Sequence, residues 1–311
     1  MAKFRDSTVD PSFIEAIAAR QAPPPEPGPA GPEVRDRSIG DIIAELRHLS
    51  VDQVEKVLEH QRSQGVRFGE AAVALGMASK DDVLFALSQQ FHYPYAPEEE
   101  RKLSPDLVTL TEPFGARAEY FRALRSQLMM RLFADGEQRR AVAVISPEAG
   151  EGKTYGASNL AVTLAQLGGR TLLVDADMRG PRMHELFRLP NQTGLSSILS
   201  GRADRGVVQQ VGSVPSLFVM PVGTTPPNPL ELVERPAFGL LMRELATKFD
   251  HVLVDTPAAV YGADASVIAA RCGSAIVVAR RNASRVNLLQ DLVASFAGSH
   301  VKLGGVVVNE F

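Results

Sequence analysis

The residues with the clearest chemical potential form a glycine-containing loop, SPEAGEGKT, at residues 146–154. The loop follows an apolar run and precedes a helix-forming segment, which is the context of a phosphate-binding loop. Such a loop wraps backbone N–H groups around phosphates, with its lysine on the outer phosphates and its threonine on Mg²⁺. Pro147 stands where a leading glycine is usual, but Gly150 and Gly152 keep the necessary backbone freedom. An incidental glycine-rich turn is the alternative, and the flanking context favours the phosphate site.

Acidic residues follow two further apolar runs. Asp175 and Asp177 come after residues 172–174, and Asp255 comes after residues 252–254. Alternation along a strand can turn both members of the first pair to one face. Carboxylates in this position beside a phosphate-binding loop hold Mg²⁺ directly or through water. Turn or helix-cap aspartates are the alternative, but three on neighbouring strands favour a metal-nucleotide site.

Composition bounds the classes of protein to consider. The chain has 311 residues and a net charge of −3, which gives no electrostatic reason to expect nucleic-acid binding. Its only cysteine, Cys272, excludes an intramolecular disulfide and is typical of the cytoplasm. No apolar run approaches the ~20 residues that span a bilayer, and the first ten residues lack the apolar core of a signal peptide. The sequence predicts a soluble, cytoplasmic protein that reaches a membrane only through a partner.

Alternating apolar runs and helical segments predict the fold of the longer part of the chain. Strands are expected at Ala141–Ile145, Thr171–Asp175, Leu217–Pro221, His251–Asp255, Ala275–Ala279 and Leu303–Val308. Helices are expected at Thr154–Leu167, Pro229–Lys248, Ala263–Arg271 and Arg285–Phe296. The strand runs do not alternate in polarity, as expected for strands buried on both faces. The predicted class is α/β, a doubly wound, mostly parallel sheet with ligands at the carboxyl ends of its strands.

Four segments are expected along the chain. Residues 1–37 are rich in proline, glycine and alanine, so we expect a disordered N-terminus. Residues 38–97 contain an internal repeat at an offset of 29, in which Ser50 aligns with Ser79, and both serines are expected to cap helices. This pattern predicts a small helical domain of two helix pairs. Residues 98–111 are read as a linker and residues 112–311 as the nucleotide-binding domain.

Several motifs together resemble the bacterial tyrosine kinases. The pattern Asp175-x-Asp177-x-Arg179 is similar to the second aspartate motif of that family, and Glu119-x-x-Arg122-x-x-Arg125 is similar to a helix motif of that family. The segments PPNPLEL at residues 226–232 and GVVVN at residues 305–309 are also similar. The resemblance covers residues ~112–311 and is strongest to the exopolysaccharide chain-length-determinant type (EpsG-like).

The resemblance implies a role for each matching residue. ATP would be bound by Ala149, Gly150, Glu151, Gly152, Lys153, Thr154, Tyr155 and Asn309. Mg²⁺ would be held by Thr154, Asp177 and Asp255. Catalysis would use Lys153 to neutralise the β- and γ-phosphates. Either Asp175 or Asp177 would accept the proton of an attacking tyrosine hydroxyl, and the sequence leaves that choice open.

The resemblance also implies partners. Glu119, Arg122 and Arg125 would reach the site of a neighbouring subunit and build a homo-oligomeric ring. A solvent-exposed helix face with one Glu–Arg pair is the alternative. A membrane polysaccharide co-polymerase, the chain-length determinant, would recruit the protein to the inner face of the plasma membrane.

Two other functions stay open. Members of the family usually end in a tyrosine-rich tail, whereas the five tyrosines here are Tyr93, Tyr95, Tyr120, Tyr155 and Tyr261. An ATP-dependent regulatory switch that transfers no phosphate to protein is therefore an alternative. A Min- or Par-type partitioning ATPase is the other. Glu148 stands at the position of their signature lysine, and there is no terminal amphipathic basic helix.

The N-terminal repeat resembles the N-terminal domain of type II secretion and pilus ATPases (MshEN-like), some of which bind cyclic di-GMP. The matching residues of the second repeat are Arg67, Phe68, Gly69, Gly76 and Gln90. The first repeat has Ser38 and Arg47 where arginine and glycine are expected. A helical docking domain that binds no nucleotide is therefore preferred over a cyclic di-GMP site.

Overall fold

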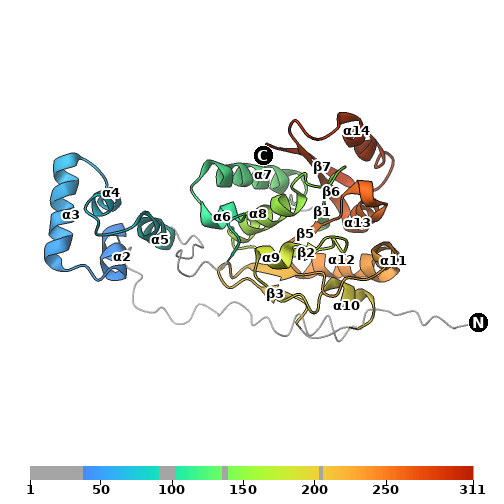
Figure 1. Cartoon of the computed structure of the whole chain (residues 1–311), viewed down its shortest axis with the longest axis horizontal. Helices are drawn as coiled ribbons and strands as arrows, with labels where there is room; N and C mark the ends of the chain where they lie inside the picture. The colour runs from blue at the N-terminus through green and yellow to red at the C-terminus, as the bar shows by residue number, and fades with distance from the viewer. Residues whose placement is uncertain (1–37, 91–102, 135–138, 203–205, 311) are drawn as a thin grey trace, which may run out of the picture. The chain divides into compact units, whose positions relative to one another are not determined.

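The computed structural model describes residues 38–90, 103–134, 139–202 and 206–310. The described residues fall into two compact units, a smaller one that ends before residue 103 and a larger one that starts there (Figure 1). Each unit has a hydrophobic core of its own. None of the described helices is long and apolar enough to cross a membrane.

The described part of the smaller unit, residues 38–90, has four helices: α2 (Ile39–Leu46), α3 (Val51–Gln64), α4 (Phe68–Ala74) and α5 (Lys80–Gln90). Helix α2 packs against α5, and α3 packs against α4. Ser50 caps α3 by accepting a hydrogen bond from the Gln53 N–H, and Ser79 caps α5 in the same way with Asp82. Both predicted caps are therefore confirmed. Gly69 packs so closely on α5 that a Cβ there would lie 2.7 Å from Val83 Cγ1. Residues 91–102 lie outside the described residues, and so does the predicted disordered segment, residues 1–37.

The larger unit is built on a seven-stranded sheet with the order β3-β4-β2-β5-β1-β6-β7. The strands are β1 (Ala141–Ile145), β2 (Thr171–Asp175), β3 (Gln209–Gln210), β4 (Leu217–Met220), β5 (His251–Asp255), β6 (Gly273–Arg280) and β7 (Lys302–Asn309). Only β3 pairs antiparallel with its neighbour, and the other five pairings are parallel. The mostly parallel α/β fold predicted from the sequence is confirmed.

Helices cover both faces of this sheet (Figure 1). They are α6 (Val108–Thr111), α7 (Ala116–Arg131), α8 (Lys153–Ala165), α9 (Met183–Leu186), α10 (Leu195–Leu199), α11 (Pro229–Glu234), α12 (Pro236–Lys248), α13 (Asp264–Cys272) and α14 (Val286–Ala294). Side chains alternate between the faces along each central strand. Val142 and Val144 of β1 pack with α7 and α8, whereas Ala143 and Ile145 pack with α12 and α13. Burial on both faces explains why the strand sequences show no polar alternation.

Two details of the sheet unit differ from the sequence prediction. The helix expected over Pro229–Lys248 is two helices, because Arg235 takes an extended conformation (φ −58°, ψ 142°) before Pro236. The ring of a proline disfavours the helical conformation for the residue that precedes it. The two-residue strand β3 was not predicted, since its polar Gln-Gln pair carries no strand signal.

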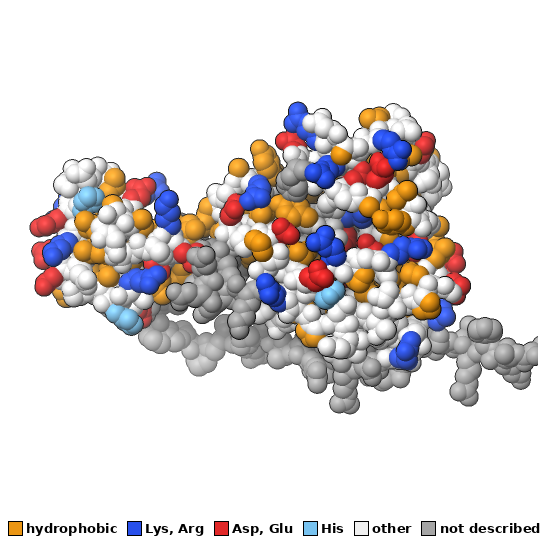
Figure 2. Space-filling model, viewed as in Figure 1, with side chains coloured by type: hydrophobic (Ala, Val, Ile, Leu, Met, Phe, Trp, Pro, Cys, Tyr) orange, Lys and Arg blue, Asp and Glu red, His pale blue; other side chains and the backbone are white. Residues whose placement is uncertain are grey.

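Figure 2 shows acidic and basic side chains interspersed with hydrophobic ones over the face in view.

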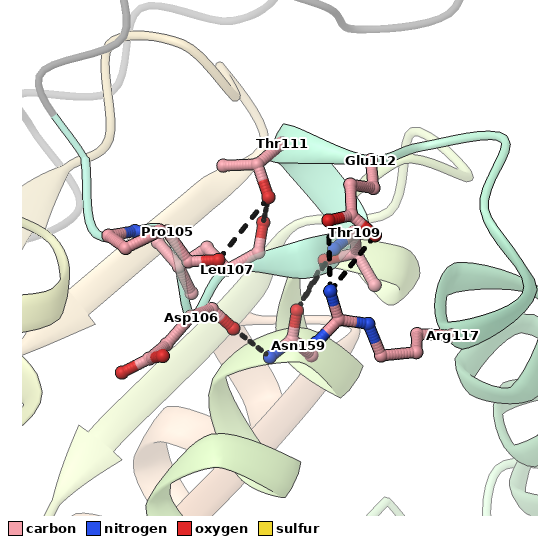
Figure 3. A network of polar contacts seen from close by, with 8 residues as sticks. All are labelled: Pro105, Asp106, Leu107, Thr109, Thr111, Glu112, Arg117 and Asn159. Atoms are coloured by element: carbon pink, nitrogen blue, oxygen red, sulfur yellow. Dashed lines mark hydrogen bonds and ion pairs between the residues drawn. The ribbon is translucent and has the colours of Figure 1, made fainter.

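Part of the segment read as a linker belongs to the core of the larger unit. Leu107 and Leu110 are buried against α7 and α8. Asn159 of α8 fastens the same segment by hydrogen bonds (Figure 3). Its Oδ1 accepts from the N–H and the hydroxyl of Thr109, both at 3.0 Å, and its Nδ2 donates to the Asp106 carbonyl at 2.9 Å. The apolar residues near the end of the expected linker therefore hold the helix that follows the phosphate-binding loop.

Candidate functional site

The phosphate-binding loop connects β1 to the start of α8, at the carboxyl edge of the sheet. Gly150 and Gly152 have φ of 75° and 93°, in the left-handed region that favours glycine. A Cβ on Gly152 would lie only 2.2 Å from Nδ2 of Asn309, so the end of β7 lies directly against the loop. The same Asn309 amide donates to the Glu151 carbonyl at 3.2 Å. The structure therefore brings Asn309 to the loop, across more than 150 residues of sequence.

Lys153 is folded into the loop. Its side chain is buried, with 7% of the residue exposed, and its Nζ donates to Ser146 Oγ at 3.0 Å. The Ser146 hydroxyl donates in turn to the Glu148 carbonyl at 2.7 Å. The ammonium group is thus held at the inner side of the loop, where it can neutralise a bound phosphate.

Asp255 ends β5 beside the loop. Its Oδ2 accepts a hydrogen bond from Thr154 Oγ1 at 2.5 Å, and its Oδ1 is buried without a hydrogen-bond partner in the described structure. Asp175 of β2 is its directly paired neighbour in the sheet. Burial raises the pKa of Asp255 to about 7, against the pull of Thr154 and Lys153. Burial, with the Asp255 charge second, also holds the pKa of Asp175 well above its ordinary range.

Asp175 and Asp177 have different environments although they are two residues apart. Asp175 is fully buried, and its two oxygens accept from the N–H groups of Asp177 and Met183. Asp177 is half-buried, and its Oδ1 accepts from the N–H groups of Arg179 and Gly180 at 3.1 and 3.0 Å. The Oδ2 of Asp177 takes no hydrogen bond from any described residue. Asp177 therefore presents an available oxygen at the site, and Asp175 does not.

The donor set fits Mg²⁺. The unpartnered Asp255 Oδ1, the Thr154 hydroxyl and the available Asp177 oxygen supply hard oxygen ligands, which Mg²⁺ prefers. Mg²⁺ usually binds one or two carboxylates together with water and substrate phosphates. The described residues include no group of three or more histidine, cysteine or acidic side chains that could coordinate a metal ion without such additional ligands.

A second loop holds the phosphate-binding loop from the other side, which sequence reasoning missed. Arg285, from the connection between β6 and α14, forms a two-pronged ion pair with Glu148, with its Nη2 2.5 Å from Oε1 and its Nε 3.3 Å from Oε2. This hydrogen-bonded pair lowers the pKa of Glu148. The adjacent Ser284 hydroxyl donates to the buried Glu151 carboxylate, which also accepts from the Glu148 N–H at 2.8 Å. No local sequence signal could have linked residues about 135 positions apart.

An apolar cavity of about 580 Å³ opens beside the loop, between α7, α8 and β7. Gly152, Tyr155 and Asn309 line it together with Phe121 and Val308. The Tyr155 ring packs edge-on against Phe121, with the ring centres 5.6 Å apart, and burial raises the pKa of its hydroxyl. The cavity is within the size range of small-molecule sites, and its aromatic and aliphatic walls suit the flat face of a base.

The three residues expected at an oligomer interface have partners within the chain. Arg122 Nη1 lies 2.7 Å from Glu119 Oε2, and its Nη2 donates to the Pro113 carbonyl. Arg125 Nη1 donates to the Thr163 carbonyl of α8 at 2.9 Å. The Glu–Arg pair expected on α7 therefore forms within the single chain, between Glu119 and Arg122. The interface role of these residues stays a prediction.

The sequence and fold define the class of the protein. A model of the CobQ/CobB/MinD/ParA nucleotide binding domain matches residues 142–311, which contain the loop, the three aspartates and Asn309. The chain is 33% identical over 193 residues to the tyrosine-protein kinase CpsD of Streptococcus agalactiae, covering 62% of this chain and 82% of that protein. Within this nucleotide-binding class, the chain belongs to the bacterial tyrosine-kinase family of the exopolysaccharide type.

Solved structures agree with this assignment. The kinase domain of the Escherichia coli tyrosine kinase ETK superposes with a TM-score of 0.62 at 28% identity, covering 66% of this chain and 79% of that one. The chimerical protein CapA2B2 superposes with a TM-score of 0.61 at 30% identity, covering 72% of this chain and 97% of that one.

Proposed function

We propose that this protein is an ATP-dependent protein-tyrosine kinase of capsule or exopolysaccharide biosynthesis. The observation that carries the proposal is the meeting of Lys153, the Thr154–Asp255 pair and Asp177 at one sheet edge, in a chain whose relatives are named tyrosine-protein kinases. Phosphoryl transfer needs positioning and charge neutralisation, and these residues can supply both.

The residues divide the work as follows. The N–H groups of Ala149, Gly150, Glu151 and Gly152 would cradle the phosphates, while Lys153 neutralises their outer charge. Thr154 and Asp255 would hold Mg²⁺ directly and Asp177 through water, which leaves the Asp177 oxygen able to take a proton; the metal would supply further neutralisation of phosphate charge. Adenine would lie in the apolar cavity, in contact with Tyr155 and Asn309.

Asp177 is the better candidate for the base. Its carboxylate has an available oxygen at the surface of the site, whereas Asp175 is buried with both oxygens engaged by backbone N–H groups. In the step itself, the acceptor tyrosine hydroxyl gives its proton to the carboxylate. The tyrosine oxygen then bonds to the γ-phosphorus. The bond between the γ-phosphorus and the oxygen that bridges it to the β-phosphate breaks, and ADP leaves.

The partners belong to the proposal as well. A membrane polysaccharide co-polymerase would recruit the protein to the inner face of the plasma membrane, with residues 38–97 as a docking domain. Glu119, Arg122 and Arg125 would join subunits into a ring. The exposed Tyr120 and Tyr261, at 74% and 56% exposure, are the described tyrosines open to modification, because Tyr155 is enclosed.

Lys153→Met tests the proposal. The purified full chain with its co-polymerase, ATP and Mg²⁺ should form phosphotyrosine, detected by mass spectrometry, and the variant should form none. Lys248→Met, which removes a lysine of α12 that pairs with Glu244, is the matched control and should retain the activity. Phosphotyrosine absent from both proteins would overturn kinase activity. ATP-dependent assembly that Lys153→Met blocks would then support the alternative regulatory switch.

A further inference from the structure

A basic cavity lies at the amino edge of the sheet, the edge opposite the phosphate-binding loop. Its volume is about 430 Å³, and its walls include the first residues of β1 and β6, Ala141 and Gly273. Four arginines and one histidine line it: Arg139, Arg140, Arg243, Arg271 and His300. Among the described residues that line it, none is an aspartate or glutamate. None of the nucleotide-site residues takes part in this cavity.

Within the described part of the chain, one acidic side chain pairs with the arginines of this cavity. Arg139 lies 3.4 Å from Asp250 Oδ1. Arg140 and Arg271 donate to backbone carbonyls, of Gly273 at 3.4 Å and of Glu234 at 2.8 Å, and no described carboxylate forms an ion pair with either. Arg243 makes no ion pair or hydrogen bond within the described structure. A carbonyl holds a guanidinium in place without cancelling its charge, so these side chains are positioned and remain available to an anion.

Two of the guanidinium groups converge because α12 carries a glycine between them. A Cβ built on Gly239 would lie 3.8 Å from Arg243 Nη1 and also 3.8 Å from Arg271 Nη1, so the two nitrogens are no further apart than twice that distance. It would lie 3.2 Å from Arg271 Cδ, which is tighter than ordinary contact. Gly239 therefore allows the positively charged groups of Arg243 and Arg271 to lie close together at the cavity. An anion bound between them stabilises this arrangement.

The floor of the cavity is apolar. Met242 and Ala246 of α12 and Ala270 and Cys272 of α13 form it, and Cys272 is buried. Guanidinium groups match the oxygens of phosphate in a two-pronged geometry, and an apolar floor suits a carbon skeleton. The volume falls within the range of small-molecule sites.

We infer that this cavity is a second ligand site, which binds a phosphate ester between Arg243, Arg271 and Arg140, with the organic part of the ester on Met242 and Cys272. A soluble organic phosphate and an anionic lipid headgroup share this chemistry, and the experiment separates them. The site is independent of the kinase assignment, because it uses none of the nucleotide-binding residues.

Calorimetric titration with inorganic pyrophosphate tests the inference on the full chain carrying Lys153→Met, which removes the main phosphate contact of the nucleotide site. We expect binding that Arg243→Gln weakens roughly tenfold or more, since a charge-assisted contact to phosphate is lost. Arg62→Gln, in the smaller unit, is the matched control with the same change in charge and should bind as the parent does. Equal affinity in Arg243→Gln and the parent overturns the inference.

Sedimentation with phosphatidylcholine vesicles, with and without phosphatidylglycerol, separates the two sources. Binding to the anionic vesicles that Arg243→Gln removes identifies a lipid headgroup, and pyrophosphate binding without vesicle binding identifies a soluble ester. Binding of neither probe overturns the site.

The only cysteine of the chain provides a second readout that works with Lys153 intact. Cys272 lines the basic cavity and is distant in the fold from the phosphate-binding loop, so its alkylation by iodoacetamide reports occupancy of this cavity alone. Burial raises the pKa of the thiol, so labelling should be slow and is followed by mass spectrometry at alkaline pH. Pyrophosphate should slow the labelling of Cys272 further in the unsubstituted chain, here the parent, and should not slow it in Arg243→Gln. Unchanged labelling in the parent contradicts the inference, and far-UV circular dichroism verifies that each variant is folded.

Discussion

Replacing Asn159 by alanine should loosen the segment that leads into α7 and, with it, the helix that carries the phosphate-binding loop. Asn159 is fully buried and takes part in four hydrogen bonds. It accepts two from Thr109 and donates one to the Asp106 carbonyl (Figure 3), and it donates a fourth to the Tyr155 carbonyl. The substitution leaves the Thr109 N–H and hydroxyl buried without an acceptor. Each such donor costs roughly 1–3 kcal/mol, so the loss of both should lower the free energy of unfolding by about 2–6 kcal/mol.

Amide hydrogen exchange can locate this loss of stability within the chain. A single unfolding midpoint would combine the stabilities of the two units and could not assign the loss to one of them. Amides of residues 104–112 should exchange at least about tenfold faster in Asn159→Ala than in the parent. Asn228→Ala is the matched control, because its exposed side chain donates only to Glu231 at 3.2 Å. That variant should change stability by no more than about 0.5 kcal/mol.

A double-mutant cycle separates the lost hydrogen bonds from the lost volume. Thr109→Val removes one of the two donors, so Asn159→Ala should cost about 1 kcal/mol less in that background. Unchanged exchange in residues 104–112 of Asn159→Ala, or equal costs in the two backgrounds, would refute the reasoning from buried donors.

Three further predictions concern the nucleotide site. In the metal-free chain, protonated Asp255 stabilises the fold at low pH, because its pKa rises from 3.8 in the unfolded chain to about 7 in the folded one. Thermal unfolding without nucleotide should therefore show stability that falls as the pH rises through that window, and Asp255→Asn should remove the part that Asp255 contributes, while buried Asp175 contributes a fall of the same sign. Glu148→Gln should release Arg285 and accelerate amide exchange in the loop between β6 and α14, while an unchanged rate would show that the ion pair does not hold that loop. Gly152→Ala should abolish nucleotide binding in calorimetry, because its Cβ would lie 2.2 Å from Asn309. Asn309→Ala should restore part of that binding, and a lack of any rescue would assign the loss to the backbone conformation alone.

The sequence predicted the central strands well because burial on both faces leaves a continuous apolar run with polar ends. Three of them, Ala141–Ile145, Thr171–Asp175 and His251–Asp255, have the predicted bounds. The edge strand β3 has no apolar run, because one of its sides is unpaired and its residues are partly exposed. The break before Pro236 was readable from the rule for residues that precede proline, and the amphipathic pattern on both sides concealed it.

The candidate site was predictable where its members follow a local pattern and was not where they come from distant segments. Lys153, Thr154 and the three aspartates follow apolar strands, and the topology of a parallel sheet brings such ends to one edge. The partners of Glu148 and Glu151, by contrast, are Arg285 and Ser284, which lie in a polar loop with no motif of its own. Only the packing of β6 beside β1 brings that loop to the phosphate-binding loop.

The carboxylates at this edge of the sheet lie in different charge environments. Asp175 and Asp255 face each other on paired strands, and burial favours the protonated form at both, so the pair carries less than its full charge. Glu148 is compensated by Arg285. If Asp255 ligates a metal as proposed, it must do so deprotonated, against the burial that raises its pKa. In the proposed site, metal binding should therefore release a proton at the sheet edge that also holds Lys153.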